Sequence, residues 1–334
     1  MKSRKNESNA MANSLSSEFD LIARYFTRPA SNAVLGVGDD AALVDVSNGM
    51  DLAVSTDTMV SGTHFFPDVN PENLGHKALA VNLSDMAAMG AMPYWAMLAV
   101  TLPSVDEAWL AAFAKGFFDL AEEFGVSLIG GDTTRGPLAL TVTIMGEVPA
   151  GAALRRSGAK AGNDVWVSGN IGDAALAVAH RHGRLVLTEA DYHEAVMRLY
   201  EPSPRVALGQ ALRGMATAAI DVSDGLLADL GHICSLSGVG ATVDVNSIPV
   251  SSIGGRHAGS DAGLTAIVAG GDDYELCFTA PANARESIEE LTDVLNVPLT
   301  RIGQIRRGKG VSLLGPDGKP MKIDGRGYDH FSGS

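Results

Sequence analysis

The sequence predicts an α/β (α+β) protein with two domains, on three observations. The chain has 334 residues, more than a single hydrophobic core usually holds. Hydrophobic residues make up 46% of it and glycine occurs 38 times, a composition typical of a globular α/β fold with many tight turns. Between residues 149 and 162 the composition shifts to glycine, alanine and basic residues. We therefore expect a loose polar tail at residues 1–17, an N-terminal domain at 18–150 and a C-terminal α/β domain at 151–334.

Charge and cysteine content argue against several classes of protein. A formal net charge of −14 and a pI near 4.9 disfavour nucleic acid and anionic membranes as partners, because both attract basic surfaces. No uninterrupted apolar run reaches the roughly 18 residues of a membrane span. Cys234 and Cys277 are too few for a disulfide framework and lack metal-ligand spacing. We expect a cytoplasmic protein with core thiols and no zinc site, which binds neither nucleic acid nor membrane.

In the N-terminal half, short apolar runs predict strands, and apolar residues at three- and four-residue spacing predict helices. Residues 41–46 and 52–55 are expected to pair as an acidic hairpin. Ser104 and Glu107 form a predicted capping box for an aromatic-striped helix that Gly125 ends. The other elements expected in this half are helices at residues 18–26 and 71–90 and strands at 94–102, 126–129 and 138–148.

The C-terminal half shows the same alternation without a known nucleotide fingerprint. Neither the GxGxxG spacing of a dinucleotide site nor the GxxxxGK[ST] of a P-loop occurs, so neither of those folds is predicted. The expected elements are strands at residues 164–168, 218–222 and 276–279, helices at 173–180, after Gly225 and at 284–295, and two short strands near the end.

Acidic residues recur at the expected ends of these elements. Asp40 precedes the first strand of the hairpin and Asp57 follows the second, Asp132 follows two glycines, Asp221 lies at the end of the strand at 218–222, and Asp224 follows that strand. Unpaired carboxylates beside apolar strands carry a large desolvation cost, so they must be solvated, hydrogen-bonded or neutralised by cations.

Each motif also has a plainer interpretation. Asp85, on one helix face with Asn82, is either a functional acid or a solvated one, and Asp132 belongs either to a ligand-binding loop or to a tight turn. Ser223 or Asp224 either caps a helix or helps to bind a phosphate-bound metal. The basic run of Arg155, Arg156 and Lys160 is either a solvated surface or a source of positive charge for a polyphosphate.

Taken together, the acids favour a divalent-cation site. Carboxylate oxygens without a cluster of histidine and cysteine select magnesium, manganese or calcium, and magnesium with phosphates is the common case. Phosphoryl transfer needs positioning and charge neutralisation more than covalent chemistry. No general base can be identified, since His64 is the only histidine near the hairpin. An acceptor that is itself a phosphate, with a second pKa of about 6, would need no base.

At these residues the chain resembles the thiamine-monophosphate kinase family. The resemblance runs from about Phe19 to Phe331 and rests on the motifs GVGDDAAL, STDTMVSGTHF, KALAVNLSDMAAMGA, LIGGDTTRGP, RSGAKAG, DVSDGLLADLGHI, GGDDYELCF and GYDHF, in this order. That family belongs to an ATP-binding superfamily shared with aminoimidazole ribonucleotide synthetase and selenophosphate synthetase.

The resemblance implies a fold and a reaction. It implies an N-terminal mixed sheet with helices that joins the sheet of a second subunit into a barrel-like homodimer, followed by a C-terminal α/β domain. It also implies direct in-line transfer of the γ-phosphoryl group of ATP to the phosphate of thiamine monophosphate, which gives thiamine diphosphate and depends on several magnesium ions.

The resemblance further assigns roles residue by residue, with no residue in a covalent catalytic role. The residues implied for ATP are Gly131, Asp132, Arg156 and Ser223, and those implied for thiamine monophosphate are His64, Asp272 and Tyr328. The implied magnesium ligands, direct or through water, are Asp40, Ser55, Thr56, Asp57, Asp85, Asp132, Asp221 and Asp224.

Two points of the resemblance stay open at the level of sequence. The family usually has glutamate where this chain has Asp272, so the shorter carboxylate is expected to reach the substrate through water. Tyr328 is either a packing residue or a stacking surface for a thiamine ring.

The alternative functions are those of the superfamily relatives and that of a non-catalytic sensor. A selenophosphate synthetase would carry a reactive cysteine near its N-terminus, and no cysteine precedes Cys234 here. A hydrogenase-maturation relative would end in a cysteine-bearing tail, which is also missing. Aminoimidazole ribonucleotide synthesis fits only if the substrate-side motifs mislead, and a sensor would bind the same nucleotide or thiamine phosphate without turnover.

Overall fold

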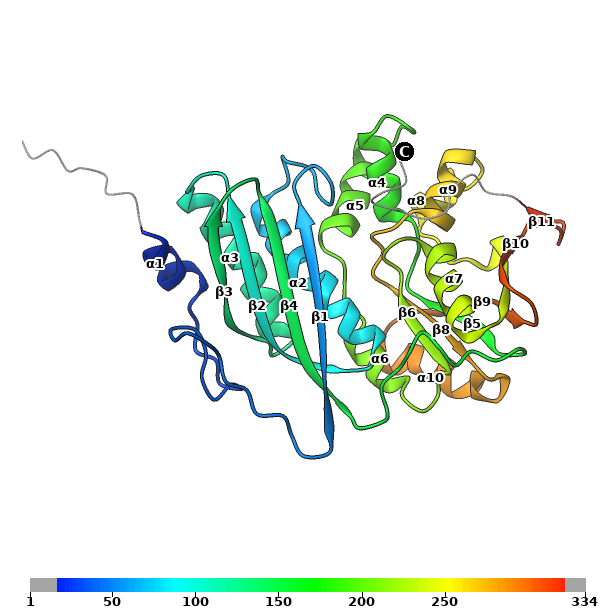
Figure 1. Ribbon diagram of the computed structural model, residues 1–334. Coiled ribbons are helices and arrows are strands. Elements are labelled where there is room, and N and C mark those ends of the chain that lie inside the picture. The colour runs from blue at the N-terminus through cyan, green and yellow to red at the C-terminus, as the bar shows by residue number, and fades with distance from the viewer. Residues whose placement is uncertain (1–16, 322–334) are drawn as a thin grey trace, which may run out of the picture.

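The computed structural model describes residues 17–321 and contains two mixed sheets with helices packed against them (Figure 1). Along the chain, the strands of one sheet all precede residues 150–163 and the strands of the other all follow them. Tyr328, its GYDHF motif and all but the last residue of the tail expected at 1–17 lie outside the described residues. Among the described helices, none has the length and apolar composition needed to cross a membrane.

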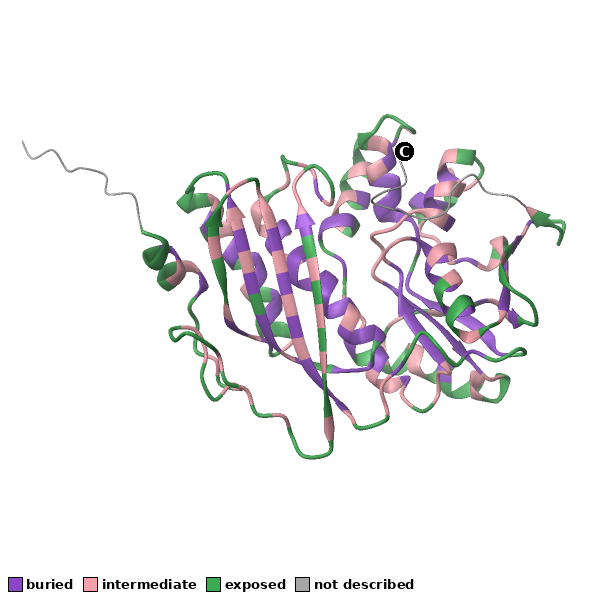
Figure 2. Cartoon of the chain, viewed as in Figure 1, coloured by how far each residue is buried: buried purple, intermediate pink, exposed green. Residues whose placement is uncertain are grey.

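The N-terminal sheet has four strands in the order β1-β4-β2-β3, with β1 and β3 at its edges. Strand β4 pairs antiparallel with β1 and β2, whereas β2 and β3 pair in parallel. Helices α2 and α3 cover one face, and the opposite face carries exposed and half-buried side chains (Figures 1 and 2). The bounds of these elements, preceded by α1, are α1 Glu18–Leu21, β1 Met50–Val60, α2 Pro71–Ala88, β2 Met92–Leu102, α3 Glu107–Glu123, β3 Ser127–Arg135 and β4 Ala139–Pro149.

Helix α2 is buried on nearly all sides because both domains pack against it. Asn70 caps it by accepting a hydrogen bond from the backbone of Glu72, and Pro71 occupies its first position. Gly75 lets α3 approach closely, since a Cβ there would lie 2.1 Å from the carbonyl oxygen of Phe113. On its other sides α2 contacts β1 and β4 and, in the C-terminal domain, helix α6 (Val206–Ala211) and strand β6 (Ala218–Asp221). Groups on α2 are therefore shared between the two domains.

The C-terminal sheet has seven strands in the order β11-β10-β7-β9-β5-β8-β6. Cys234 and Cys277 are buried in the apolar core of this domain, as the sequence predicts. The strands are β5 Asp164–Ser168, β6 Ala218–Asp221, β7 Gly240–Asp244, β8 Leu276–Ala280, β9 Leu299–Arg306, β10 Gly310–Leu314 and β11 Pro320–Met321. The helices are α4 Asp173–Arg181, α5 Glu189–Tyr200, α6 Val206–Ala211, α7 Leu226–Ser237, α8 Ser252–His257, α9 Asp261–Ala269 and α10 Arg285–Leu295.

The predicted acidic hairpin is wrong. Residues 41–46 form no strand, and their one ladder contact is an isolated bridge between Leu35 and Leu43. The second predicted strand is longer than expected, because all eleven residues of β1 pair with β4. Asp57 consequently lies within a strand and not after one.

Two other boundaries also differ from prediction. The Gly130–Arg135 segment, expected as a ligand-binding loop or a tight turn, continues β3 because it pairs residue by residue with Met97–Leu102 of β2. The cap of α3 is Asp106, which accepts hydrogen bonds from the backbones of Ala108 and Trp109, and not the expected pair of Ser104 and Glu107.

Candidate active site

Four carboxylates from different elements approach one another where the two domains meet, and we call them the carboxylate cluster: Asp57, Asp85, Asp221 and Asp224. Asp57 lies on β1, Asp85 on α2, Asp221 at the end of β6 and Asp224 in the loop after it. The side chains of Asp57 and Asp85 are in hydrogen-bond contact, and Asp57 also interacts electrostatically with Asp224.

Two serine hydroxyls hold the cluster. Ser55 on β1 donates to Asp85 Oδ2 at 2.5 Å, and Ser84 on α2 donates to Asp221 Oδ2 at 2.8 Å. Since Ser84 and Asp85 are neighbours on α2, one turn of this helix reaches both β1 and the C-terminal domain. Ser55 was predicted as part of the site, whereas Ser84 was not.

The cluster carries more negative charge than its surroundings balance. Burial, then repulsion from Asp85, raises the pKa of Asp57 to about 6, and the same two causes raise the pKa of Asp221 to about 7. Burial also raises the pKa of Asp85. The Arg156 guanidinium opposes these shifts at Asp85 and Asp221. A bound divalent cation would relieve this repulsion, and hard oxygen donors are the ligands that magnesium prefers, so these residues fit that ion.

The loop after β6 is organised by Asp229, which the sequence analysis missed. Asp229 Oδ2 accepts hydrogen bonds from the backbones of Ser223, Asp224 and Gly225, each at 3.1 Å. These three N–H groups just before α7 are therefore already bonded to Asp229. The group of Ser223 that could bind a ligand is its hydroxyl. Burial, followed by Asp221 and Asp224, raises the pKa of Asp229 to about 8.

A histidine lies beside Asp224 and Asp229. His232 lies one turn along α7 from Asp229, and ligand atoms of Asp224, Asp229 and His232 lie within 4.8 Å of one another. The i and i+3 spacing of Asp229 and His232 was the available sequence signal, because residues three apart share a helix face.

Thr56 and Asp132, both predicted as metal ligands, do not join the cluster within one chain. The Thr56 hydroxyl lies on the opposite face of β1 from Asp57 and bonds that of Thr143 at 2.8 Å. Asp132 on edge strand β3 is aligned through β2 and β4 with Thr58 of β1. Three strand spacings separate them, roughly 14 Å.

Asp40 also lies apart from the cluster. It is exposed near the tip of a loop closed by the Leu35–Leu43 bridge. Asn32, at the base of this loop, donates hydrogen bonds to the carbonyls of Tyr94, near the start of β2, and Gly125, just before β3. The loop is thus anchored toward the far edge of the sheet from β1 (Figure 1).

Gly131 has a structural explanation. A Cβ at this position would lie 1.9 Å from the carbonyl oxygen of Leu98 on β2, and the φ angle is +154°. The pairing of β2 and β3 therefore requires a glycine here, whether or not a ligand also approaches it.

Asp272, the predicted substrate residue, lies in a turn beside the cluster. The backbones of Asp272 and Tyr274 donate to the carbonyls of Ser223 and Val222, both at 2.9 Å. Burial and nearby carboxylates, first Asp272 and then Asp57, hold the pKa of Tyr274 well above its usual range. The turn that carries Asp272 is thus fixed to the loop that carries Asp224.

His64 lies in the turn after β1, where its Nδ1 accepts a hydrogen bond from the backbone of Val60 at 3.0 Å. Two residues further on, the backbone of Phe66 donates to the Tyr200 hydroxyl at 3.3 Å. The Tyr200 ring lies 5.7 Å from Lys77 Nζ, which contacts Asp272. Tyr200 therefore links the segment after His64 to Lys77, a residue that the sequence did not single out.

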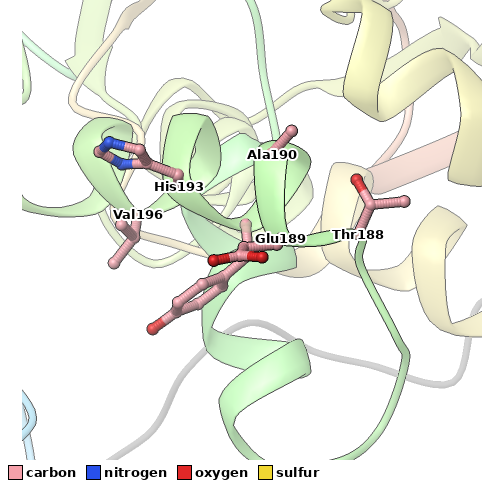
Figure 3. Close-up of a pocket in the computed structure, with 6 residues that line it drawn as sticks. Thr188, Glu189, Ala190, His193 and Val196 are labelled. Carbon is pink, nitrogen blue, oxygen red and sulfur yellow. The ribbon is translucent and has the colours of Figure 1, made fainter.

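A separate hollow lies on the surface of α5 and is drawn in Figure 3. Among residues 17–321, none that the sequence assigns to a site lines this hollow, so the candidate site rests on the carboxylate cluster. Its lining residues are Thr188, Glu189, Ala190, Tyr192, His193 and Val196.

Comparison with known proteins places both halves of the chain in one class. Residues 38–148 match the family model of the AIR synthase related protein N-terminal domain, and residues 160–315 match that of the C-terminal domain. The fold and the site thus define a protein of the AIR synthase related class.

The full-length relatives give the family. The chain is 50% identical over 320 residues to the thiamine-monophosphate kinase of Salmonella typhimurium, covering 94% of this chain and 98% of that protein. The chain belongs to the thiamine-monophosphate kinase family, as the sequence motifs predict, and is an enzyme of that family, a phosphotransferase with a phosphate group as acceptor.

Solved structures agree with this assignment. The crystal structure of thiamine-monophosphate kinase from Stenotrophomonas maltophilia K279a has a TM-score of 0.82 and 47% identity, and the match covers 92% of this chain and 98% of that one. AaThiL complexed with AMPPCP and TMP has a TM-score of 0.74 and 28% identity, over 86% of this chain and 89% of that one.

Proposed function

We propose that this enzyme transfers the γ-phosphoryl group of ATP in line to the phosphate of thiamine monophosphate, giving thiamine diphosphate, with magnesium bound at the carboxylate cluster. The observation that carries the proposal is the convergence of Asp57, Asp85 and Asp221 from β1, α2 and β6. The family and the relative with bound AMPPCP and TMP support the choice of substrates.

The residues that would hold several magnesium ions are the four of the cluster together with Ser55. Asp40, Asp132 and the backbone carbonyl of Thr56 complete the proposed set. Magnesium, when bound, would neutralise the phosphate oxygens of the two anionic substrates.

ATP would be held by positive charge and by hydroxyl and backbone groups around the cluster. The Arg156 guanidinium acts on both Asp85 and Asp221, which supports a role beside the polyphosphate. The Ser223 hydroxyl and the Gly131–Asp132 segment are the other groups proposed for ATP.

The acceptor side lies next to the cluster in this proposal. Asp272 and His64 would line the thiamine monophosphate pocket together with Tyr328, and the electrostatic contact of Tyr274 with Asp57 and Asp221 supports a short path from this pocket to the cluster. An acceptor phosphate with a second pKa of about 6 is already deprotonated near neutral pH, so no side chain is assigned as a base.

We also infer a cytoplasmic homodimer in which two N-terminal sheets join. The open face of the sheet exposes Leu52, Val54 and Met97, and such a patch on a folded domain favours a partner. A second copy on this side would supply the Asp132 and Asp40 that one chain holds away from its own cluster. The two buried free thiols support the cytoplasm, where cysteines stay reduced.

The test is turnover with purified enzyme, ATP, magnesium and thiamine monophosphate. We expect many molecules of thiamine diphosphate per enzyme and none after chelation. Asp57→Asn and Asp224→Asn should abolish turnover, whereas Asp293→Asn, at an exposed position of α10, should not change it. Tight binding of both substrates without product, or turnover that survives chelation, would contradict the proposal.

A further inference from the structure

Lys77 is a buried cation at the boundary of the proposed thiamine monophosphate pocket. Its side chain is 1% exposed, and Nζ donates a hydrogen bond to Asp272 Oδ1 at 2.6 Å. The rings of Tyr200 and Tyr274 lie 5.7 and 6.0 Å from Nζ. A buried ammonium is costly unless it is paired, so the contact with Asp272 is the one that makes this position tenable.

Both hydrogen bonds to the Asp272 carboxylate go to the same oxygen. The Tyr274 hydroxyl donates to the same oxygen, Asp272 Oδ1, at 3.3 Å. The Asp272 side chain nevertheless remains 31% exposed. Two donors thus restrain one oxygen while part of the carboxylate stays accessible to a ligand.

The backbone at Asp272 is held in an unusual conformation. Its φ angle is +69°, which a residue other than glycine adopts at a cost in free energy. Gly271 packs closely on the same loop, since a Cβ there would lie 2.1 Å from the carbonyl oxygen of Ser223. Backbone contacts therefore fix the position of the Asp272 Cα, and the hydrogen bond from Lys77 fixes the orientation of the carboxylate.

Lys77 also belongs to the helix that carries Asp85. Two turns of α2 separate the two residues, and α2 is packed between the domains. Lys77 accordingly links Asp272 of the C-terminal domain to α2, the helix that carries Asp85, a proposed metal ligand.

We propose that Lys77 is a positioning residue that holds the Asp272 carboxylate in a single orientation for binding thiamine monophosphate. The proposal rests on the proposed function above. Lys77 acts through Asp272 and does not itself contact the substrate, because its Nζ is buried and engaged.

The test compares Lys77→Met with Lys77→Arg. We expect the methionine variant to raise the KM for thiamine monophosphate roughly 10- to 100-fold, the usual effect of losing a hydrogen bond to a charged group, with kcat and the KM for ATP changed by less than about threefold. The arginine variant keeps the charge and should recover much of the loss. Lys115→Met, at an exposed site on α3, is the matched control and should behave as the unmodified enzyme.

A double variant separates positioning from folding. Lys77→Met leaves a carboxylate unpaired, whereas Lys77→Met with Asp272→Asn leaves no unpaired charge and should recover thermal stability without recovering affinity for thiamine monophosphate. If stability and affinity return together, Lys77 is merely structural. An unchanged KM for thiamine monophosphate, or a loss confined to kcat, would also overturn the proposal.

Binding measurements keep this test independent of the proposed reaction. Calorimetric titration of each variant with thiamine monophosphate and the ATP analogue AMPPCP reports affinity without turnover. Weak binding by Lys77→Met beside tight binding by the unmodified enzyme supports the positioning role even if no product forms. Equal affinities in the two proteins contradict it, and failure of turnover in the unmodified enzyme contradicts the proposed function alone.

Discussion

Ser84 of the N-terminal domain donates a hydrogen bond to Asp221 of the C-terminal domain, with 2.8 Å between Oγ and Oδ2, and both side chains are buried. The next residue on α2, Asp85, accepts from Ser55 of β1. The carboxylate cluster therefore exists only while the two domains keep this arrangement, and we expect its affinity for cations to depend on this contact.

Removing the Ser84 hydroxyl should weaken magnesium activation. The hydrogen bond from Ser84 favours the ionised form of Asp221, so Ser84→Ala should raise the pKa of that carboxyl further and require several-fold more magnesium for half-maximal turnover. A buried hydrogen bond of this kind also contributes about 1 kcal/mol to the free energy of unfolding. Magnesium titration of initial rates measures the first effect, with the exposed Ser104→Ala as control. Equal magnesium dependence in both variants would refute the link.

Magnesium affinity should fall as the pH is lowered. Asp57, with a pKa of about 6, and Asp221, with a pKa of about 7, must lose their protons before a cation binds, so protons compete with magnesium below about pH 7. Between about pH 8 and pH 6 the apparent dissociation constant should rise by roughly tenfold or more. Calorimetry in buffers of different ionisation enthalpy should detect proton release on binding. A constant affinity over this range would show that these carboxyls do not bind the ion.

The metal-free enzyme should be more stable at mildly acidic pH. The folded-state pKa of Asp221, about 7, is raised above the ordinary 3.8, so its stabilising contribution is complete below about pH 4 and is lost as the pH rises through about 7. Asp221→Asn should therefore unfold at a higher temperature than the unmodified protein near pH 8 with a chelator present, although it should have no turnover. Thermal unfolding checks this, with Asp293→Asn as control. A lower melting temperature for Asp221→Asn would mean that the buried charge is already compensated.

Gly131→Ala should destabilise the sheet. The new Cβ would lie 1.9 Å from the Leu98 carbonyl, so β2 and β3 would have to move apart, at a cost of about 1–3 kcal/mol in the free energy of unfolding. Denaturant unfolding measures this cost. Gly231→Ala, on α7 with open space around its Cβ position, is the control and should leave stability the same or slightly higher. Loss of ATP binding at normal stability would instead assign Gly131 to the ligand.

The sequence predicted most of the elements because their signals are local. The helix predicted at 71–90 begins at the same proline and ends two residues early, at Ala88. The strand predicted at 164–168 is reproduced residue for residue. The hairpin failed because strand partners are chosen across the fold, and β4 offers β1 a full eleven-residue match. The turn at Gly130–Arg135 failed for the same reason.

The four acids of the cluster could be singled out from the sequence, but the residues that hydrogen-bond to acids of the candidate site could not. Asp57, Asp85, Asp221 and Asp224 stand out as carboxylates beside apolar segments, whereas Ser84 and Lys77 acquire meaning only from residues far along the chain. The separation of Asp132 from Asp57 could not be foreseen either, since it follows from the strand order β1-β4-β2-β3.

The claim that divalent cations let this cluster hold a nucleotide is tested most directly by calorimetric titration of AMPPCP with and without magnesium, in the unmodified enzyme and in Asp85→Asn. We predict that magnesium tightens binding by roughly a hundredfold or more in the unmodified enzyme, about 3 kcal/mol, and by far less in the variant. Equal affinity after chelation, or an unaltered magnesium effect in Asp85→Asn, would contradict the account.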